Sequence, residues 1–449
     1  MLFHVSKSDA EYLTNLRSKS QEKVIMAKNE ELVMNGSGVE EIGFPGWPKF
    51  APEVTGEVAR VLDSGKVNYW TGKIGMEFEE AFAKWSGAGF AISCTNGTAA
   101  LHIALSALGV GAGDEVIVPS YTFIASSFSV VQAGAIPVFC DVTEDHTLDP
   151  KRIEPLITPR TKAIVVVHLY GVVADMGAIM EIAKKHNLYV VEDCAQCIGG
   201  KYKGKTVGLI GDVGCYSFCQ SKHFTTGGEG GMVITDNEDL AWECRSFRDH
   251  GYDVRTRMNM LALEEKLPYI HRRVGFNYRM TEMQSVIGLC ELRRFDSWNL
   301  RRRLDYAEMY DKAFSSLKGI KAIPVNTPER QNSYWWYPIL LDLDVVNIPA
   351  KDFIKELIGM GIPCSGILWP ESYLEQAYQE GVGFGKAQFP FKSKEYTDPK
   401  AVDYSNVLCP VAKSLRDQTV SLFLHPSWEP CHINKVIEAV KEVIKNHSK

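Results

Sequence analysis

Between Phe90 and Thr235 the chain alternates short apolar runs with stretches in which apolar residues recur every three or four positions. Such runs are typical of buried strands, and the recurring pattern is typical of helices. Together they predict an α/β fold with a mostly parallel sheet covered by helices on both faces. The expected strands are 90–94, 115–119, 136–142, 163–170, 188–194, 213–218 and 232–235, and the clearest helices between them are 98–108 and 176–187.

The pattern changes after Gly275, where longer helical stretches flank fewer strands. A long helix is expected to begin at Thr281, which is spaced from Gln284 as in a capping box. The later elements predict a smaller α+β domain at the carboxyl end. The expected elements are a helix over 281–314, a strand within 334–344, helices over 350–361 and 432–447, and a surface loop at 381–399 rich in Gly, Pro and Lys. The expected domains are a polar helical arm (1–40), a large domain (41–299) and a small domain (300–449).

Composition narrows the classes of function. The 449 residues are 45% hydrophobic and 23% charged, as in an ordinary soluble enzyme. The formal net charge of −6 leaves no basic excess to neutralise phosphates, which argues against a general nucleic-acid-binding protein. No apolar stretch reaches membrane-spanning length, and the first residues lack the apolar core of a signal peptide. We therefore expect a cytoplasmic protein with small-molecule partners.

The eleven cysteines are scattered, many of them in apolar runs, which suits reduced thiols better than a disulfide framework. One spacing resembles a zinc ribbon, namely Cys194-x-x-Cys197 followed by Cys215-x-x-x-Cys219. Cys194 ends an apolar strand and the second pair lies on another, whereas zinc knuckles usually occupy exposed turns. Zinc is therefore the lesser alternative, and no metal is expected.

Because ligands of parallel sheets bind beyond the carboxyl ends of the strands, the residues after each strand are candidates for a site. After the first strand, Gly97 and Thr98 open a helix whose free amides could bind an anion, although a plain helix cap would look the same. After the second strand, Tyr121 and Phe123 offer rings that could stack on a flat cofactor or simply belong to the core.

Later strands add charged groups to the same edge. Asp193 ends one strand and Gln196 follows it, while Ser217 ends another and Lys222 follows five residues later. Each residue alone has an ordinary structural explanation. In combination, an anion site, a stacking ring, a buried acid and a loop lysine are what pyridoxal 5'-phosphate needs, because the lysine binds its aldehyde and the acid keeps its ring nitrogen protonated.

Several longer motifs carry a family resemblance. They are "TNGTAALHIALSALGVGAGDEVIVPSYTF" (95–123), "VHLYG" (167–171), "EDCAQ" (192–196), "SFCQSK" (217–222), "GEGG" (228–231), "RDHG" (248–251) and "GFNYRMTEMQSVIGL" (275–289). The chain resembles the DegT/DnrJ/EryC1/StrS aminotransferases, which are pyridoxal-phosphate-dependent transferases of fold type I.

The resemblance implies a role for each of these residues. Lys222 would carry the cofactor, Asp193 would pair with its ring nitrogen, and Gln196 would contact the ring near its hydroxyl. Phe123 would stack on the ring, and the phosphate would be held by Gly97, Thr98 and Ser217. Asn277 would reach the phosphate site of a partner subunit, which implies a homodimer with shared active sites.

One departure from the family pattern bears on the catalytic residue. Gly227 and Gly228 both precede Glu229, where the family usually has a single glycine. Counting back from Glu229 would place His223 at the catalytic position, whereas counting forward from Ser217 gives Lys222. Only a lysine can bind the aldehyde, and a dehydratase branch of the family carries histidine there. Lys222 therefore favours amino transfer over dehydration.

The substrate is less constrained. Segments 44–50 and 67–73 and the Gln-Ser-Lys at 220–222 are similar to the scyllo-inosose aminotransferase branch. They favour a keto-cyclitol or ketosugar acceptor, a cyclic polyol ketone, with glutamine or glutamate as donor in a ping-pong reaction. The alternative is a nucleotide-linked 3-keto or 4-keto sugar. Expected substrate contacts, each of which could equally be structural, are His168, Tyr170, His250 and Arg279.

Two rival functions remain at this point. "GVGAG" at 109–113 suggests a nicotinamide oxidoreductase, but it follows a helix and precedes a strand, which is the wrong context for a dinucleotide turn. The other rival is a non-catalytic protein that binds pyridoxal phosphate. Joint retention of Lys222, Asp193 and Gln196 argues against it.

Overall fold

A computed structural model describes residues 43–255, 270–366, 371–396 and 402–449. Residues Phe44–Lys449 form one compact unit, and the expected helical arm at 1–40 lies outside the described residues. No helix in the described ranges is both long and apolar enough to cross a membrane. All eleven cysteines are described, and each is a free thiol.

The central sheet has seven strands, and each expected strand is present. In spatial order they are β1 (Phe90–Cys94), β9 (Gly231–Thr235), β8 (Val213–Ser217), β5 (Tyr189–Asp193), β4 (Thr161–Val167), β2 (Glu115–Pro119) and β3 (Ile136–Cys140). The strand pairs from β8 across to β3 are parallel, whereas β9 runs antiparallel to both β8 and β1. The mostly parallel sheet of the prediction is confirmed.

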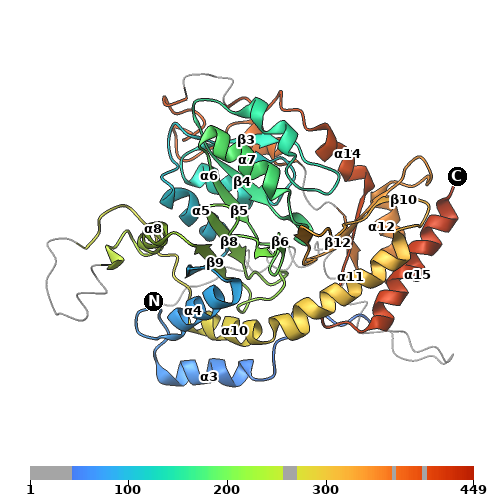
Figure 1. Ribbon diagram of the computed structural model, residues 1–449, viewed down its shortest axis with the longest axis horizontal. Coiled ribbons are helices and arrows are strands. Elements are labelled where there is room, and N and C mark those ends of the chain that lie inside the picture. Colours follow the sequence, from blue (N-terminus) through green and yellow to red (C-terminus); the bar gives the residue numbers. More distant parts are fainter. Residues whose placement is uncertain (1–42, 256–269, 367–370, 397–401) are drawn as a thin grey trace, which may run out of the picture. The chain divides into compact units, whose positions relative to one another are not determined.

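Helices cover both faces of this sheet (Figure 1). On one face, α5 (Gly97–Ala107), α6 (Ala125–Gln132) and α8 (Glu238–Arg248) form a core with side chains such as Leu101, Val130 and Leu240. On the other, α4 (Ile74–Ser86) and α7 (Met176–His186) pack Phe78, Phe82 and Ile179 against the strands. Because both faces are buried, the strands can be apolar along their whole length.

The predicted long helix at 281–314 is interrupted. It begins as α10 (Glu282–Arg293) with the expected capping box, in which Thr281 Oγ1 accepts from the Gln284 amide. A π-helical stretch, Phe295–Leu300, then joins α10 to α11 (Arg301–Phe314). In Figure 1 the two helices follow one another in yellow along the lower part of the molecule.

A second, four-stranded sheet follows in the order β10 (Ile320–Ala322), β12 (Tyr337–Leu341), β14 (Thr419–Leu422), β13 (Cys364–Ser365). Its core includes side chains from α11, α12 (Ala350–Gly359) and α15 (Pro430–His447). The domain boundary expected near residue 300 stays a prediction, because part of the chain after it packs against the large sheet again. Tyr373, Tyr378 and Tyr404, with other residues between 371 and 418, belong to the core of the large sheet.

The stretch at 381–399, for which the sequence predicts a surface loop, is more firmly anchored than expected. Its described part, 381–396, has no regular helix or strand, yet Phe391 and Tyr396 are buried against the large sheet. The Tyr396 hydroxyl donates to the Asp114 carbonyl at 2.8 Å and accepts from the Gly113 amide at 3.0 Å. The expected surface loop is present, since residues 384–387 are exposed, but Gly and Pro reveal only the irregular backbone and not the aromatic anchors.

Candidate active site

A cavity of about 520 Å³ lies at the carboxyl ends of the parallel strands. Its walls include seven of the eight residues predicted to bind the cofactor, and the eighth, Asn277, lies outside it. The predicted residues on its wall are Gly97, Thr98, Phe123, Asp193, Gln196, Ser217 and Lys222. The topology therefore gathers residues that are far apart in sequence, because every strand that precedes them ends at the same edge.

Asp193 ends β5 with its side chain toward this cavity, whereas its neighbour Glu192 faces the opposite side of the sheet. The Asp193 carboxylate accepts hydrogen bonds from the Ser126 hydroxyl at 2.8 Å and the Ala195 amide at 3.1 Å. Burial raises the pKa of Asp193, while these hydrogen bonds and the charge of Lys222 oppose the rise. The carboxylate is thus fixed in place and sensitive to a cationic partner.

Lys222 lies in the hairpin between β8 and β9. Its amine lies 4.3 Å from the centroid of the Trp335 ring. Burial lowers its pKa to about 8, and the negative charge of Asp193 limits the fall. A substantial fraction of the amine is therefore neutral near pH 8, as a nucleophile or proton acceptor requires.

The two glycines that precede Glu229, one more than the family pattern usually has, lie within this hairpin. Gly227 and Gly228 have φ values of +90° and +118°, which favour glycine, and the Gly228 carbonyl accepts from the Gln220 amide at 2.8 Å. His223 is fully buried away from the cavity, with Nε2 3.2 Å from the Ser333 carbonyl. Only Lys222 of the two lies on the cavity wall, in agreement with the forward count from Ser217.

The amino end of α5 forms the third part of the site. Asn96 caps this helix by accepting from the Ala99 amide at 2.8 Å, so the helix begins at the cavity wall with Gly97 and Thr98. A Cβ on Gly97 would lie 2.7 Å from the Ser217 Cβ, so only glycine lets the helix approach β8 this closely. Free amides at a helix start favour an anion such as a phosphate.

The expected substrate contacts do not reach the cavity. His168 is fully buried, with Nε2 3.1 Å from Glu192 and Nδ1 accepting from the Ala174 amide at 3.1 Å. Neither ring nitrogen is left for a substrate, so its predicted contact is corrected to a structural role. Tyr170 is also fully buried, bonded through its hydroxyl to Tyr121, and it too is structural.

His250 and Arg279 belong to a separate polar group around Asp249, whose carboxylate also accepts from the Trp70 indole. None of these residues lines the cavity, and Asn277 is likewise exposed outside it. Within one chain, the structure therefore does not bring His250, Arg279 or Asn277 to Lys222.

The zinc alternative also fails on geometry. Among the described residues, the one group of three with ligand atoms within 4.8 Å of one another is His168, Glu192 and Cys194, not the four cysteines of the ribbon spacing. The Glu192 carboxylate is already engaged by the amides of Gly208, Ile210 and Gly211 at 2.7–2.8 Å. This group ties the 208–211 loop to the sheet.

Some wall residues lie outside the sequence prediction. Trp335 and Trp336, stacked with their centroids 4.0 Å apart, close one side of the cavity. They lie just before β12 in "YWWY", within the segment 334–344 in which the sequence predicts a strand. Four consecutive aromatic residues were the available signal. Tyr334 and Tyr337 pack in the core of the second sheet, whereas the two tryptophans line the cavity.

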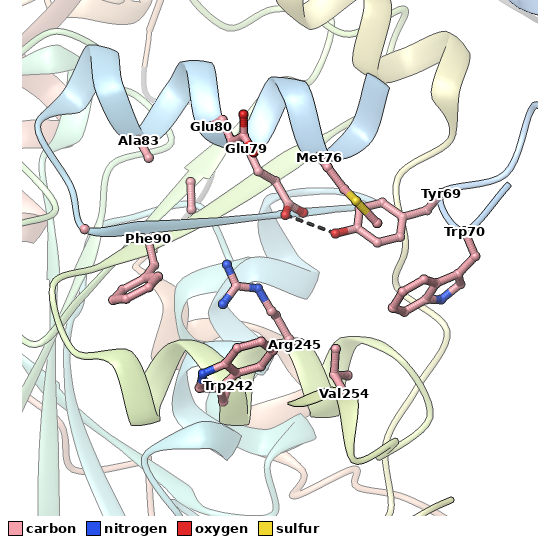
Figure 2. Close-up of a pocket in the computed structure, with 12 residues that line it drawn as sticks. Tyr69, Trp70, Met76, Glu79, Glu80, Ala83, Phe90, Trp242, Arg245 and Val254 are labelled. Atoms are coloured by element: carbon pink, nitrogen blue, oxygen red, sulfur yellow. Dashed lines mark hydrogen bonds between the residues drawn. The ribbon is translucent and has the colours of Figure 1, made fainter. Parts of the chain in front are cut away.

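A second cavity, of about 350 Å³, lies beside α4 and α8 (Figure 2). The Arg245 guanidinium lies near the rings of Phe90 and Trp242, and the buried Glu79 carboxylate accepts from the Tyr69 hydroxyl at 3.1 Å. None of the described residues lining it is a lysine. The chemistry predicted from the sequence therefore belongs to the first cavity.

Comparison with known proteins gives this geometry a context. The model of the DegT/DnrJ/EryC1/StrS aminotransferase family matches residues 48–441. The chain belongs to this family. The glycine run at 109–113, which suggested a nicotinamide enzyme, lies between α5 and β2, away from the carboxyl ends of the strands.

Individual members of the aminotransferase family are similar over most of their length. GDP-perosamine synthase of Caulobacter vibrioides is 42% identical over 67% of this chain and 78% of its own. dTDP-3-amino-3,4,6-trideoxy-alpha-D-glucose transaminase of Streptomyces venezuelae is 41% identical over 62% of this chain and 69% of its own. The X-ray structure of an aminotransferase from Psychrobacter cryohalolentis superposes with a TM-score of 0.80 and 37% identity, covering 90% of this chain and 99% of that one.

Proposed function

We propose that this chain is a pyridoxal-phosphate-dependent aminotransferase that moves an amino group from glutamate or glutamine to the ketone of a nucleotide-linked sugar. The observation that carries the proposal is the meeting of the Lys222 amine, the Asp193 carboxylate and the amino end of α5 in one cavity. The cofactor fits this set, because it needs an amine for its aldehyde, an acid for its ring nitrogen and an anion site for its phosphate.

Each part of the chain has a task in this proposal. When bound, pyridoxal 5'-phosphate supplies an electron-accepting ring and stores the amino group between the two half-reactions. The α5 amides, Thr98 and Ser217 would hold the phosphate, and Phe123 would cover the ring. Asp193 would keep a proton on the ring nitrogen. Lys222, with its lowered pKa, would take a proton from the donor carbon and return it.

The proposed acceptor departs from the first expectation. Sequence motifs favour a free keto-cyclitol, with a nucleotide-linked sugar as the alternative. The two named relatives, a GDP-sugar and a dTDP-sugar enzyme, support the alternative. We therefore propose a nucleotide-linked keto sugar as the acceptor, in place of the keto-cyclitol of the scyllo-inosose branch.

We also propose that the enzyme is a homodimer with shared active sites. Asn277 is exposed outside the cavity, and next to it Ile270, Val274 and Phe276 expose 49%, 82% and 43% of their surface. Exposed apolar side chains clustered in sequence support a protein interface. Sedimentation should show a dimer, and Val274→Asp should convert it to monomers with weaker cofactor binding. A fully active monomer would refute the shared site.

The function is tested with the purified chain, the cofactor and panels of amino donors and keto acceptors. We expect a visible absorption band that fades with glutamate or glutamine, and aminated product by mass spectrometry with nucleotide-linked keto sugars. After borohydride reduction, the cofactor mass should be found on the peptide with Lys222 and be lost in Lys222→Ala. Amination of free cyclitols alone would refute the proposed nucleotide-linked acceptor. Cofactor mass on a peptide without Lys222 would refute the assignment of this lysine.

A further inference from the structure

The backbone that carries Lys222 is held in an unusual way. Three successive carbonyls, those of Ser221, Lys222 and His223, each accept a hydrogen bond from a side chain more than 70 residues away in sequence. Trp335 Nε1 donates to the Ser221 carbonyl at 2.5 Å, and Trp47 Nε1 donates to the Lys222 carbonyl at 3.1 Å. Asn299 Nδ2 donates to the His223 carbonyl.

These donors are themselves fixed. Arg303 is fully buried and donates to the Asn299 side-chain oxygen at 2.9 Å and to the Tyr334 and Trp335 carbonyls at 3.0 Å each. Asn299 lies in the π-helical stretch between α10 and α11, a rare geometry that recurs at functional sites. One buried cation thus connects two of the three donors.

The third donor is supported by aromatic stacking. The Trp47 ring is nearly parallel to the His425 ring, with an interplanar angle of 2° and centroids 5.6 Å apart, and it also stacks on Trp298. Its indole N–H therefore has little freedom to leave the Lys222 carbonyl. All three donors come from outside the seven-stranded sheet. The hairpin that carries Lys222 connects two strands of this sheet, but side chains from other segments fix its position.

We propose that Trp47, Asn299 and Trp335 form a clamp that positions the Lys222 amine in the cavity. The clamp holds three consecutive peptide groups, so the hairpin cannot swing the lysine into solvent, and the Trp335 ring lies 4.3 Å from the amine it positions. A side chain held by rigid neighbours reacts faster than one that must find its geometry. The inference rests on the proposed role of Lys222, but it concerns residues that act through the backbone.

The test uses the cofactor-free protein, so its result does not depend on turnover. Lys222 is labelled with an amine-selective acylating reagent across a pH series, and its peptide is quantified by mass spectrometry against other lysines of the same digest. The variants are Trp47→Phe and Trp335→Phe, which keep a ring but lose the indole donor, and Asn299→Ala. Trp242→Phe is the matched control, because it removes an exposed indole bond to Glu238 on α8.

Each clamp variant should move the labelling midpoint of Lys222 upward, toward that of an ordinary lysine, because a freed hairpin lets the amine reach water. A rise of about one pH unit would lower the neutral fraction of Lys222 at pH 8 roughly fivefold. The Trp242→Phe midpoint should stay at the wild-type value. Thermal unfolding is followed in parallel. If Asn299→Ala does not fold, Trp47→Phe decides, because it removes a single hydrogen bond, the one to the Lys222 carbonyl.

A midpoint that is unchanged or lower in folded Trp47→Phe and Trp335→Phe overturns the clamp. In the loaded enzyme, the same two variants should lower kcat more than they change KM for the amino donor. Failure of the proposed function looks different. In that case the wild-type chain binds no cofactor at Lys222, while the labelling profiles of the variants still report on the clamp.

Discussion

At the scale of single residues, the site depends on a lysine and an aspartate whose charges influence each other. Burial lowers the pKa of Lys222 and raises that of Asp193, and each charge opposes the shift of the other. The sequence could suggest both residues, since each follows a strand. Counting residues alone leaves both Lys222 and His223 open, because the extra glycine makes the two counts disagree. The need for an amine favours Lys222, and the fold places only this one of the two side chains on the cavity wall.

The lowered pKa of Lys222 predicts unusual reactivity in the cofactor-free protein. At pH 8 about half of this amine should be neutral, since its pKa is about 8, compared with roughly 0.4% for an ordinary lysine. Its labelling rate should therefore level off above pH 8, whereas the rates of exposed lysines keep rising. A Lys222 profile that matches the exposed lysines would contradict this value.

Replacing Asp193 with Asn should make Lys222 a still weaker base. The negative charge of Asp193 favours the ammonium form, so its removal should move the labelling midpoint of Lys222 below about 8. Asp239→Asn, on the exposed surface of α8, serves as the control and should leave the profile unchanged. An unchanged midpoint in Asp193→Asn would show that the two groups do not interact.

At the scale of elements, the start of α5 and the end of β8 approach so closely that the contact needs a glycine. Gly97→Ala should place its methyl group against Ser217, cost about 1–3 kcal/mol of unfolding free energy, and weaken binding of the cofactor phosphate. Denaturant unfolding and a binding titration measure the two effects.

Gly56→Ala is the matched control for this substitution. Gly56 lies in helix α3 (Val54–Ser64), where an added methyl group would have no neighbouring atom within 4 Å, so alanine should stabilise the helix by up to about 1 kcal/mol. Equal stability changes in the two variants would show that the contact between Gly97 and Ser217 is not tight.

The elements themselves were predictable to different degrees. Strands of the large sheet are continuous apolar runs, so their positions followed from the sequence. The π-helical stretch after α10 could not be predicted in this way, because residues 281–314 keep a helical pattern throughout. Only the hydrogen bonds of Asn299 reveal the altered turn. The clamp could not be predicted from the sequence either, because its hydrogen bonds join segments that are far apart along the chain.

At the scale of the whole chain, segments between residues 371 and 418 return to the large sheet. Asp141, just after β3, accepts from the amides of Val411 and Ala412 at 3.0 Å each and so caps helix α14 (Pro410–Gln418). His146 adds a 2.9 Å contact from Nε2 to the Thr419 hydroxyl at the start of β14. No sequence pattern indicated these contacts, because a cap supplied from 270 residues away has no local spacing.

Asp141→Ala should therefore loosen this junction. Loss of the cap should lower the unfolding free energy by about 1–2 kcal/mol and leave the Lys222 labelling profile as in the wild type, because Asp141 is not among the residues lining the site. Asp417→Ala, at the other end of α14, is the control. A loss in Asp141→Ala no larger than in that control would mean that the cap contributes little.

The antiparallel pairing of β8 and β9 has a practical consequence for comparing relatives. The two ends of the lysine hairpin are joined by the Phe218 amide, which donates to the Gly230 carbonyl at 2.8 Å, and Gly227 and Gly228 lie between these ends with positive φ values. Because two glycines precede Glu229 here, an alignment anchored on this downstream glutamate with a single glycine before it places His223 at the reactive position. Numbering from the upstream serine keeps it in register.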